Sequence, residues 1–254
     1  RLILTDGLPV SDAQDFLMIE AVPRNNNDVS LSVWNAGDAL KGIILAGVLV
    51  IGLSLLFNYI NSHFIANAES TRSWFLTFEI GFLGELVFVL AAWTFSIKKY
   101  RISWPDFGFC KPVGDRYVLM TFLALGASLY FSIFYVQIIS LLGLDFLIPE
   151  LLITLPQNGS LLAALFGFSV IVVAPFSEEI FYRSFLIQGM RSKTSVPIAI
   201  ILSALLFSAS HLSIGILIPA AFSGVILGWL FLYTRSLWPP MLVHAIQNSL
   251  AYSS

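Results

Sequence analysis

The sequence is poor in charged residues. Asp, Glu, Lys and Arg together make up 11% of its 254 residues, whereas soluble globular domains carry about 25%. This shortage excludes a surface that faces water over most of its area. Hydrophobic residues make up 57% of the chain, and the mean hydropathy is +0.86. We therefore expect a multi-pass membrane protein that forms one domain in the bilayer.

Cysteine and clustered positive charge are scarce as well. Cys110 is the single cysteine, which excludes a disulfide within the chain. The formal net charge is -2, and the sequence has no basic patch of the kind that nucleic-acid-binding proteins use. Nucleic acid is therefore excluded as a partner.

Two catalytic motifs are missing. H-E-x-x-H, the usual signature of an intramembrane metalloprotease, does not occur, because Leu212 follows His211 and Ala245 follows His244. G-x-S-x-G, the motif that presents a nucleophilic serine, is also absent. These absences disfavour a zinc protease of the usual type and a serine hydrolase.

Seven apolar stretches are long enough to span, or nearly span, a bilayer. Backbone polar groups in lipid must be bonded within their own segment, so each stretch is predicted to be α-helical. The sequence thus predicts an all-α, polytopic membrane helix bundle with about seven transmembrane helices. The predicted spans are Ile43–Ile60, Trp74–Ile97, Tyr117–Gly143, Leu161–Met190, Val196–His211, Ile214–Tyr233 and Leu237–Tyr252.

The chain divides into three segments. Residues 1–39 have no long apolar window and are predicted to form an extramembrane N-terminal arm. Residues 40–157 hold the N-terminal transmembrane helices, and residues 158–254 hold the core helices. Basic residues gather on one predicted side of the membrane, which the positive-inside rule makes the inner side, with the N-terminus inside. They are Lys41, Lys98, Lys99, Arg101, Lys111, Arg116, Arg191, Lys193 and Arg235.

Charged residues follow an apolar run in the segment Pro175–Arg183. Charge inside a membrane is costly unless it is paired or functional, so this segment is the candidate active centre. Glu179 and Arg183 are four residues apart and share one helix face, where they are predicted to form an ion pair that supports the site. Glu178 is turned by about 100° from Glu179 and needs another partner.

Polar residues on two other helices reach a similar depth. At ~1.5 Å rise per residue, Glu178, His211 and Asn248 lie roughly 18–23 Å from the inner ends of their helices. By the same rule His244 lies about 12 Å from its inner end. Helical spacing puts Phe207 on the face of His211, and it puts His244 on the face of Asn248. The shared depth predicts one catalytic or ligand-binding site in place of scattered core residues.

Other polar and small residues in the spans favour packing over chemistry. Glu79 and Glu85 are six residues apart and no motif surrounds them. Each is interpreted as a bundle-facing hydrogen-bonding group or as the lining of a polar cavity, outside the site. Gly224 and Gly228 form a small-xxx-small pair, which predicts close contact between helices.

Two chemical interpretations fit the predicted site. In the first, Glu178 acts as a general base with His211 and activates a water molecule. His244 and Asn248 then donate hydrogen bonds to the oxyanion that forms at a carbonyl. This is an acyl-transfer hydrolase without a covalent intermediate. In the second, Glu178, His211 and His244 bind zinc.

The motif residues resemble those of a known family. Three motifs occur in order, Glu178-Glu179-x-x-x-Arg183, Phe207-x-x-x-His211 and His244-x-x-x-Asn248. With the run Gly228–Pro240, they are similar to the motifs of the CPBP family, the CAAX prenyl protease and bacteriocin-processing (Abi) intramembrane glutamic endopeptidases. The resemblance covers about Leu161–Ser249. Tyr182 and Ser184 stand where phenylalanine and glycine are common in that family.

The resemblance implies intramembrane proteolysis of a peptide bond near the end of a membrane-associated protein or peptide, prenylated or not. The catalytic residues would be Glu178, His211, His244 and Asn248, and Glu179, Arg183 and Phe207 would support the site structurally. No cofactor or metal is expected, and zinc is kept as a minority alternative because the family was once described as metal-dependent. The expected setting is the bacterial cytoplasmic membrane.

A second function, from another class, stays open at this point. The unusual arm of residues 1–39 fits a non-catalytic subunit or chaperone that has kept the fold and binds a partner in a larger membrane complex. Such a pseudoenzyme would keep its function when Glu178 is replaced. A transporter is disfavoured, because no pair of interrupted helices occurs at corresponding positions of two halves.

Overall fold

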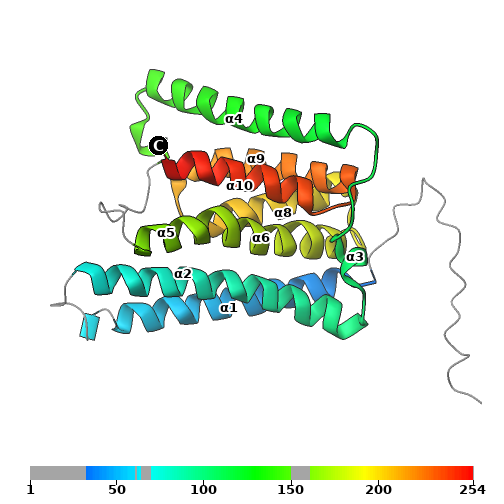
Figure 1. The fold of residues 1–254 in the computed structure, drawn as a ribbon, viewed down its shortest axis with the longest axis horizontal. Coiled ribbons are helices and arrows are strands. Elements are labelled where there is room, and N and C mark those ends of the chain that lie inside the picture. Colours follow the sequence, from blue (N-terminus) through cyan, green and yellow to red (C-terminus); the bar gives the residue numbers. More distant parts are fainter. Residues whose placement is uncertain (1–32, 61, 64–69, 150–160, 254) are drawn as a thin grey trace, which may run out of the picture. The chain divides into compact units, whose positions relative to one another are not determined.

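The computed structural model describes residues 33–60, 62–63, 70–149 and 161–253, with residues 70–80, 162 and 253 described by their backbone alone. Every regular element among these residues is helical, and the long helices run side by side (Figure 1). The all-α prediction is therefore confirmed for the described part of the chain. Of the predicted N-terminal arm, residues 1–32 lie outside the described residues.

Among the described residues, seven long helices correspond to the seven predicted apolar stretches. Six of them are α1 (Ala36–Ile60), α2 (Ser70–Trp93), α4 (Tyr117–Leu141), α8 (Val196–Ser210), α9 (Ile214–Thr234) and α10 (Trp238–Ser253). The seventh runs without interruption through α5 (Leu161–Phe168), η5 (Ser169–Val173), α6 (Ala174–Glu178), η6 (Glu179–Ile187) and α7 (Gln188–Met190). The shorter elements are η3 (Thr94–Lys98), which continues α2, α3 (Trp104–Phe107) and η4 (Asp145–Leu147).

Five of these helices are long and apolar enough to cross a membrane. They are Ala36–Ile60, Gly81–Lys98, Tyr117–Leu141, Ala163–Met190 and Ile214–Thr234. With 15 and 16 residues, α8 and α10 are shorter than the ~20 residues that a span usually needs. A polytopic helix bundle is thus confirmed, whereas the number of about seven spans stays a prediction.

The continuous helix from Leu161 to Met190 lies at the centre of the packing. Its α6 part contacts α2, its η6 part contacts α8, and its η5 part contacts α10. On one side α1 covers α2, and on the other α9 packs between α8 and α4 (Figure 1). The main core cluster contains Phe181, Tyr182 and Phe185 from η6 and Phe207 from α8. The candidate active centre therefore lies in the helix that the others surround.

Helix α1 begins seven residues before the predicted span, at Ala36. Its first turn carries the buried carboxylate of Asp38, which accepts from Lys99 Nζ at 2.5 Å and from the Tyr100 hydroxyl at 2.6 Å. Just before the helix, buried Trp34 donates from Nε1 to the Phe185 carbonyl at 2.8 Å. These polar contacts tie the start of α1 to the bundle, and the apolar window of the sequence does not include them.

The predicted close contact at Gly224 and Gly228 is confirmed. A Cβ atom at Gly224 would lie 2.9 Å from Ala204 Cβ and 3.0 Å from Ala204 Cα on α8. A Cβ atom at Gly228 would lie 3.0 Å from Ile187 Cδ1. At Gly224 a Cβ atom would be closer to α8 than real Cβ contacts are, so glycine there permits α9 to approach α8 this closely; at Gly228 the neighbour is the end of the Ile187 side chain on η6.

Gly224→Val is expected to lower the free energy of unfolding by about 1–3 kcal/mol, because the backbone of Ala204 cannot move aside as a side chain can. Denaturant titration in detergent micelles measures the loss. Gly126→Val is the matched control, since a Cβ atom at Gly126 on α4 meets nothing within 4 Å. Equal losses in the two variants would contradict the interpretation.

Candidate active site

Glu179 is the most buried carboxylate of the predicted site. Its side chain is 0% exposed, and Arg183 Nε lies 3.0 Å from Glu179 Oε2. His244 Nδ1 lies 2.9 Å from the other oxygen, Oε1. Within the described part of the chain, the Arg183 nitrogens form no hydrogen bond, so charge attraction holds this pair together. The carboxylate is therefore held from two sides, by an adjacent turn of its own helix and by α10.

Glu178 meets the same histidine from the neighbouring position. His244 Nε2 lies 3.5 Å from Glu178 Oε2, and Glu178 is 9% exposed. The spacing along the helix predicted that Glu179 pairs with Arg183 and that Glu178 has a different partner. In the structure, one imidazole from α10 contacts both glutamates, one through each ring nitrogen.

His211 stands at the end of α8. It occupies the C-cap position, and Leu212 after it has a φ of 52° and is 90% exposed. His211 Nδ1 lies 2.9 Å from the Phe207 carbonyl oxygen. Since a carbonyl only accepts hydrogen bonds, Nδ1 carries the hydrogen, and Nε2 of the neutral ring keeps its lone pair. The free nitrogen of His211 is therefore a hydrogen-bond acceptor.

The Phe207 ring connects these residues. Its centroid lies 4.9 Å from that of His211 and 5.5 Å from that of His244, both in edge-to-face arrangements. The Arg183 guanidinium lies 4.3 Å from the same ring centroid, a cation–π contact. Tyr182, one of the two departures from the family pattern, packs edge-to-face on Phe207 at 5.4 Å.

Asn248 lies apart from this cluster. Its Nδ2 donates to the Val170 carbonyl at 2.8 Å. In the π-helical element η5 the Ala174 N–H bonds the Ser169 carbonyl, five residues back. The next amide in that register belongs to Pro175, which has no N–H, so the Val170 carbonyl lacks a donor from its own helix. Asn248 supplies one.

A cavity of about 560 Å³ opens on the cluster. Glu178 and His211 line it together with Glu85 from α2, and most of its remaining walls are apolar side chains of α1, α2, η6 and α8. His244 and Asn248 are not part of its lining. The structure thus brings two of the four predicted catalytic residues to one cavity and places His244 directly behind Glu178.

Glu85 is the residue of this cavity that the sequence left outside the site. Of its two interpretations, the hydrogen bond is confirmed, because the Ser177 hydroxyl hydrogen-bonds Glu85 Oε2; Glu85 also lines a cavity, but most of the walls of that cavity are apolar. The only signal in the sequence was a carboxylate within an apolar span, and no motif marked it. The side chain of Glu79 lies outside the described ones.

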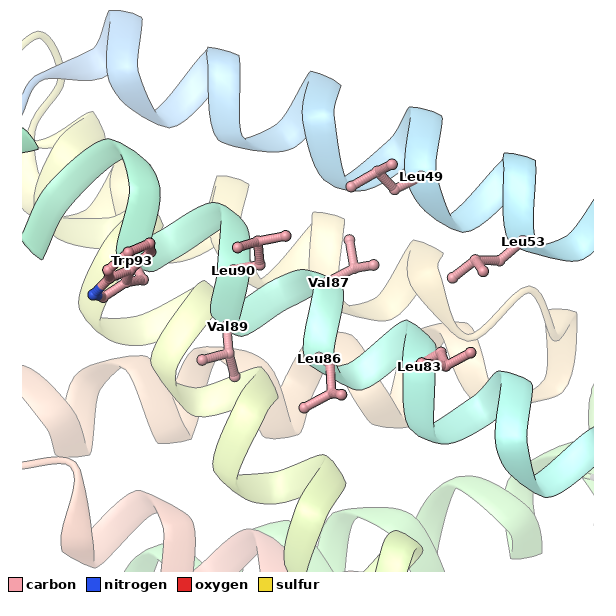
Figure 2. A pocket seen from close by; sticks show the side chains of 8 residues that line it. All are labelled: Leu49, Leu53, Leu83, Leu86, Val87, Val89, Leu90 and Trp93. Carbon is pink, nitrogen blue, oxygen red and sulfur yellow. The ribbon is translucent and has the colours of Figure 1, made fainter. Parts of the chain in front are cut away.

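A second hollow, of about 530 Å³, lies between α1 and α2. Leu49 and Leu53 project into it from α1, and six side chains of α2 complete the lining (Figure 2). Those six are Leu83, Leu86, Val87, Val89, Leu90 and Trp93. No titratable side chain belongs to this lining, so this hollow offers no group for acid–base chemistry.

The metal-ligating side chains of the described residues are dispersed. They include no group of three His, Cys, Asp or Glu side chains arranged to hold a metal ion. The three residues of the zinc alternative are Glu178, His211 and His244. Of these, His244 contacts Glu178 directly, while His211 is turned by its bond to the Phe207 carbonyl.

Comparison with protein families gives a match over part of the chain. The family model described as type II CAAX prenyl endopeptidase Rce1-like matches residues 160–250. Residues 160–250, called the Rce1-like region below, are thus similar to this family. The Rce1-like region contains all seven predicted site residues and leaves out α1 and α2. No curated protein and no solved structure matched the chain.

The match confirms the family that the three motifs predicted. The chain is therefore an integral, multi-pass membrane protein whose Rce1-like region matches a family of CAAX-type intramembrane proteases. It also sets the environment of a substrate, which is a peptide or protein held in the lipid bilayer.

Proposed function

We propose that the chain is an intramembrane glutamic endopeptidase that hydrolyses a peptide bond near the end of a membrane-associated protein or peptide. One observation carries this proposal: a carboxylate and an imidazole, Glu178 and His211, share the wall of an otherwise largely apolar cavity. Such a pair binds one water molecule and activates it next to an apolar substrate segment.

The water lies between Glu178 and His211. One of its hydrogens is donated to the Glu178 carboxylate and the other to His211 Nε2, the nitrogen that keeps a lone pair. The water oxygen attacks the carbonyl carbon while Glu178 takes the proton. Glu178 then gives this proton to the nitrogen of the departing amine as the C–N bond breaks. The oxygen of the water and its second hydrogen stay on the carbonyl carbon as part of the new carboxyl group. The first proton has gone to the amine, so Glu178 is again ionised.

His244 and Asn248 stabilise the oxyanion. The distance of 3.5 Å between His244 Nε2 and Glu178 is too long for a strong hydrogen bond. Because His244 Nδ1 donates to Glu179 Oε1, Nε2 carries a hydrogen only in the imidazolium form, and that N–H is then available to a substrate oxygen beside Glu178. The role of Asn248 in the oxyanion hole stays a prediction, because Asn248 lies outside the cavity lining and donates one of its two amide hydrogens to Val170. Preorganised donors of this kind contribute largely to acyl transfer.

The substrate enters from the bilayer. The cavity lining includes Ile51 on α1 and Leu212 beyond α8, which are 61% and 90% exposed. Both side chains are apolar, so the open side of the cavity faces hydrocarbon. The described lining contains no Lys or Arg, and an apolar peptide segment is the substrate that fits these walls.

Cleavage assays in proteoliposomes test the proposal. The wild-type protein is incubated with membrane-anchored peptides, prenylated and unprenylated, and the products are identified by mass spectrometry. New C-termini are expected near the ends of some peptides, with none in the Glu178→Gln variant. Failure to cleave any peptide, or equal cleavage by the variant, would overturn the proposal. Activity that EDTA abolishes and zinc restores would replace the water mechanism by the zinc alternative.

Narrowing the cavity is expected to change substrate choice. Gly84→Leu places a side chain where the Cβ position meets nothing within 4 Å and the residue lines the cavity. The kcat/KM for peptides with bulky side chains is expected to fall by roughly 10-fold or more, and that for small side chains much less. Gly52→Leu is the control, because its Cβ position is equally open and outside the cavity. A uniform loss for all peptides would contradict this role.

A further inference from the structure

Glu85 brings a second carboxyl group into the cavity that Glu178 and His211 line. It lies on α2, outside the Rce1-like residues 160–250, and the proposed mechanism assigns it no role. Among the described residues, no Lys, Arg or His forms an ion pair with it, and its hydrogen-bonding partner is the Ser177 hydroxyl. Ser177 is the residue next to Glu178, so Glu85 is connected to the proposed base through one side chain.

The Ser177 hydroxyl has more oxygen neighbours than hydrogens. Besides Glu85 Oε2, it lies 2.9 Å from the Val173 carbonyl and 3.1 Å from the Ala174 carbonyl. Carbonyls only accept, and an ionised Glu85 would also only accept, so one hydrogen would face three acceptors. A protonated Glu85 donates its own hydrogen to Ser177 Oγ. The hydroxyl hydrogen is then free for the carbonyls of its own helix, and every contact contains a hydrogen.

The charges around the cavity favour the same state. Two carboxylates facing one apolar cavity repel each other, and such a pair avoids ionising twice. Glu178 has His244 Nε2 at 3.5 Å, which is an ion pair when the imidazole is protonated, whereas no Lys, Arg or His is paired with Glu85 in the described part of the chain. The proposed mechanism needs Glu178 as the ionised base, so Glu85 is the carboxyl group that keeps its proton.

We propose that Glu85 is a positioning residue of the peptidase. Held in its protonated form, it hydrogen-bonds Ser177, fixes the backbone next to Glu178 and leaves Glu178 as the single ionised carboxylate of the cavity. This inference rests on the proposed function and adds to it a residue from α2, a helix that the family match does not include.

Substitutions at Glu85 test the hydrogen bond. Glu85→Ala is expected to lower kcat by about 10–100-fold, the usual effect of losing a residue that orients a reacting group, with a much smaller change in KM. Glu85→Gln is expected to recover most of this loss, because its amide donates to Ser177 Oγ and stays neutral. A glutamine variant as inactive as the alanine variant would overturn the proposal, since proton exchange would then be the essential property.

The pH dependence of activity distinguishes a protonated Glu85 from a residue that only supports the fold. As pH rises, Glu85 loses its proton and places a second negative charge beside Glu178, so wild-type activity is expected to fall on the alkaline side. The glutamine variant cannot ionise, and its alkaline limb is expected at higher pH. The other titratable groups are unchanged between the two proteins: Glu178, His211 and Tyr182 in the cavity, and Glu179, Arg183 and His244 behind it. Identical alkaline limbs would contradict the proposal.

Infrared spectroscopy separates this inference from the proposed function. In a Glu178→Gln background, a C=O stretch of a protonated carboxylic acid is expected at neutral pH and is lost when Glu85→Gln is added. The measurement needs no cleavage. A missing band would overturn the inference while leaving the peptidase proposal intact. A wild-type protein that shows the band and cleaves no peptide would overturn the peptidase proposal alone.

Discussion

Glu178→Gln is expected to reduce peptide hydrolysis by about 10²–10⁴-fold, the range for loss of a general base. Glutamine has the size of glutamate and can hydrogen-bond the same water, but its amide oxygen does not take a proton from it. Substrate binding is expected to persist, because the lining of the cavity is otherwise unchanged. The loss should therefore appear in kcat, measured by product formation in proteoliposomes, while peptide crosslinking to the protein remains.

Two further variants serve as comparisons for Glu178→Gln. Glu178→Asp keeps the base but withdraws it by one methylene, so intermediate activity is expected. Asp145→Asn, the same carboxylate-to-amide change at an exposed residue of η4, is expected to leave activity unchanged. Full activity of Glu178→Gln alongside measurable cleavage by the wild type would show that the base is another group.

Arg183→Met is expected to lower the free energy of unfolding by roughly 3–5 kcal/mol, because it leaves a buried carboxylate without its compensating cation. Arg183 and Glu179 are 1% and 0% exposed in their side chains and lie 3.0 Å apart. Methionine keeps much of the length and apolar contact of the arginine stem, so the loss reflects charge more than volume. Denaturant titration in detergent micelles measures it.

The double variant Glu179→Gln, Arg183→Met distinguishes charge imbalance from lost packing. Removing both charges is expected to recover part of the stability, since no uncompensated ion remains. Arg116→Met serves as the control, because Arg116 is exposed before α4. If the double variant had a lower free energy of unfolding than Arg183→Met, the two substitutions would act independently. This result would contradict the ion-pair interpretation.

The bounds of the central helix show how far a sequence pattern reaches. The predicted span Leu161–Met190 coincides with the continuous run from α5 to α7, because hydrophobic content and helical hydrogen bonding are properties of the segment itself. The Glu179–Arg183 spacing and the Gly224–Gly228 pair are equally local. Helix α1 shows the limit, since its first turn depends on Lys99 and Tyr100, which lie about sixty residues away.

The partners of the site residues show the same limit. Asn248 was grouped with His244 from their spacing, but its hydrogen bond goes to Val170, whose carbonyl is released by a π-helical turn and Pro175. A change of helical register of this kind is not visible in hydrophobic periodicity. The contact of Glu85 with Ser177 could not be predicted from the sequence either, because it depends on the rotation of α2 relative to α6.

The sequence by itself determined the membrane class, the helices, the family motifs and the presence of charge in the segment Pro175–Arg183. Each of these follows from composition or from spacing within one helix. The tertiary structure decided that His244 contacts both glutamates and that Glu178 shares a cavity with His211 and Glu85. These relations depend on the rotation and depth of helices far apart in the chain, which packing sets and spacing does not encode.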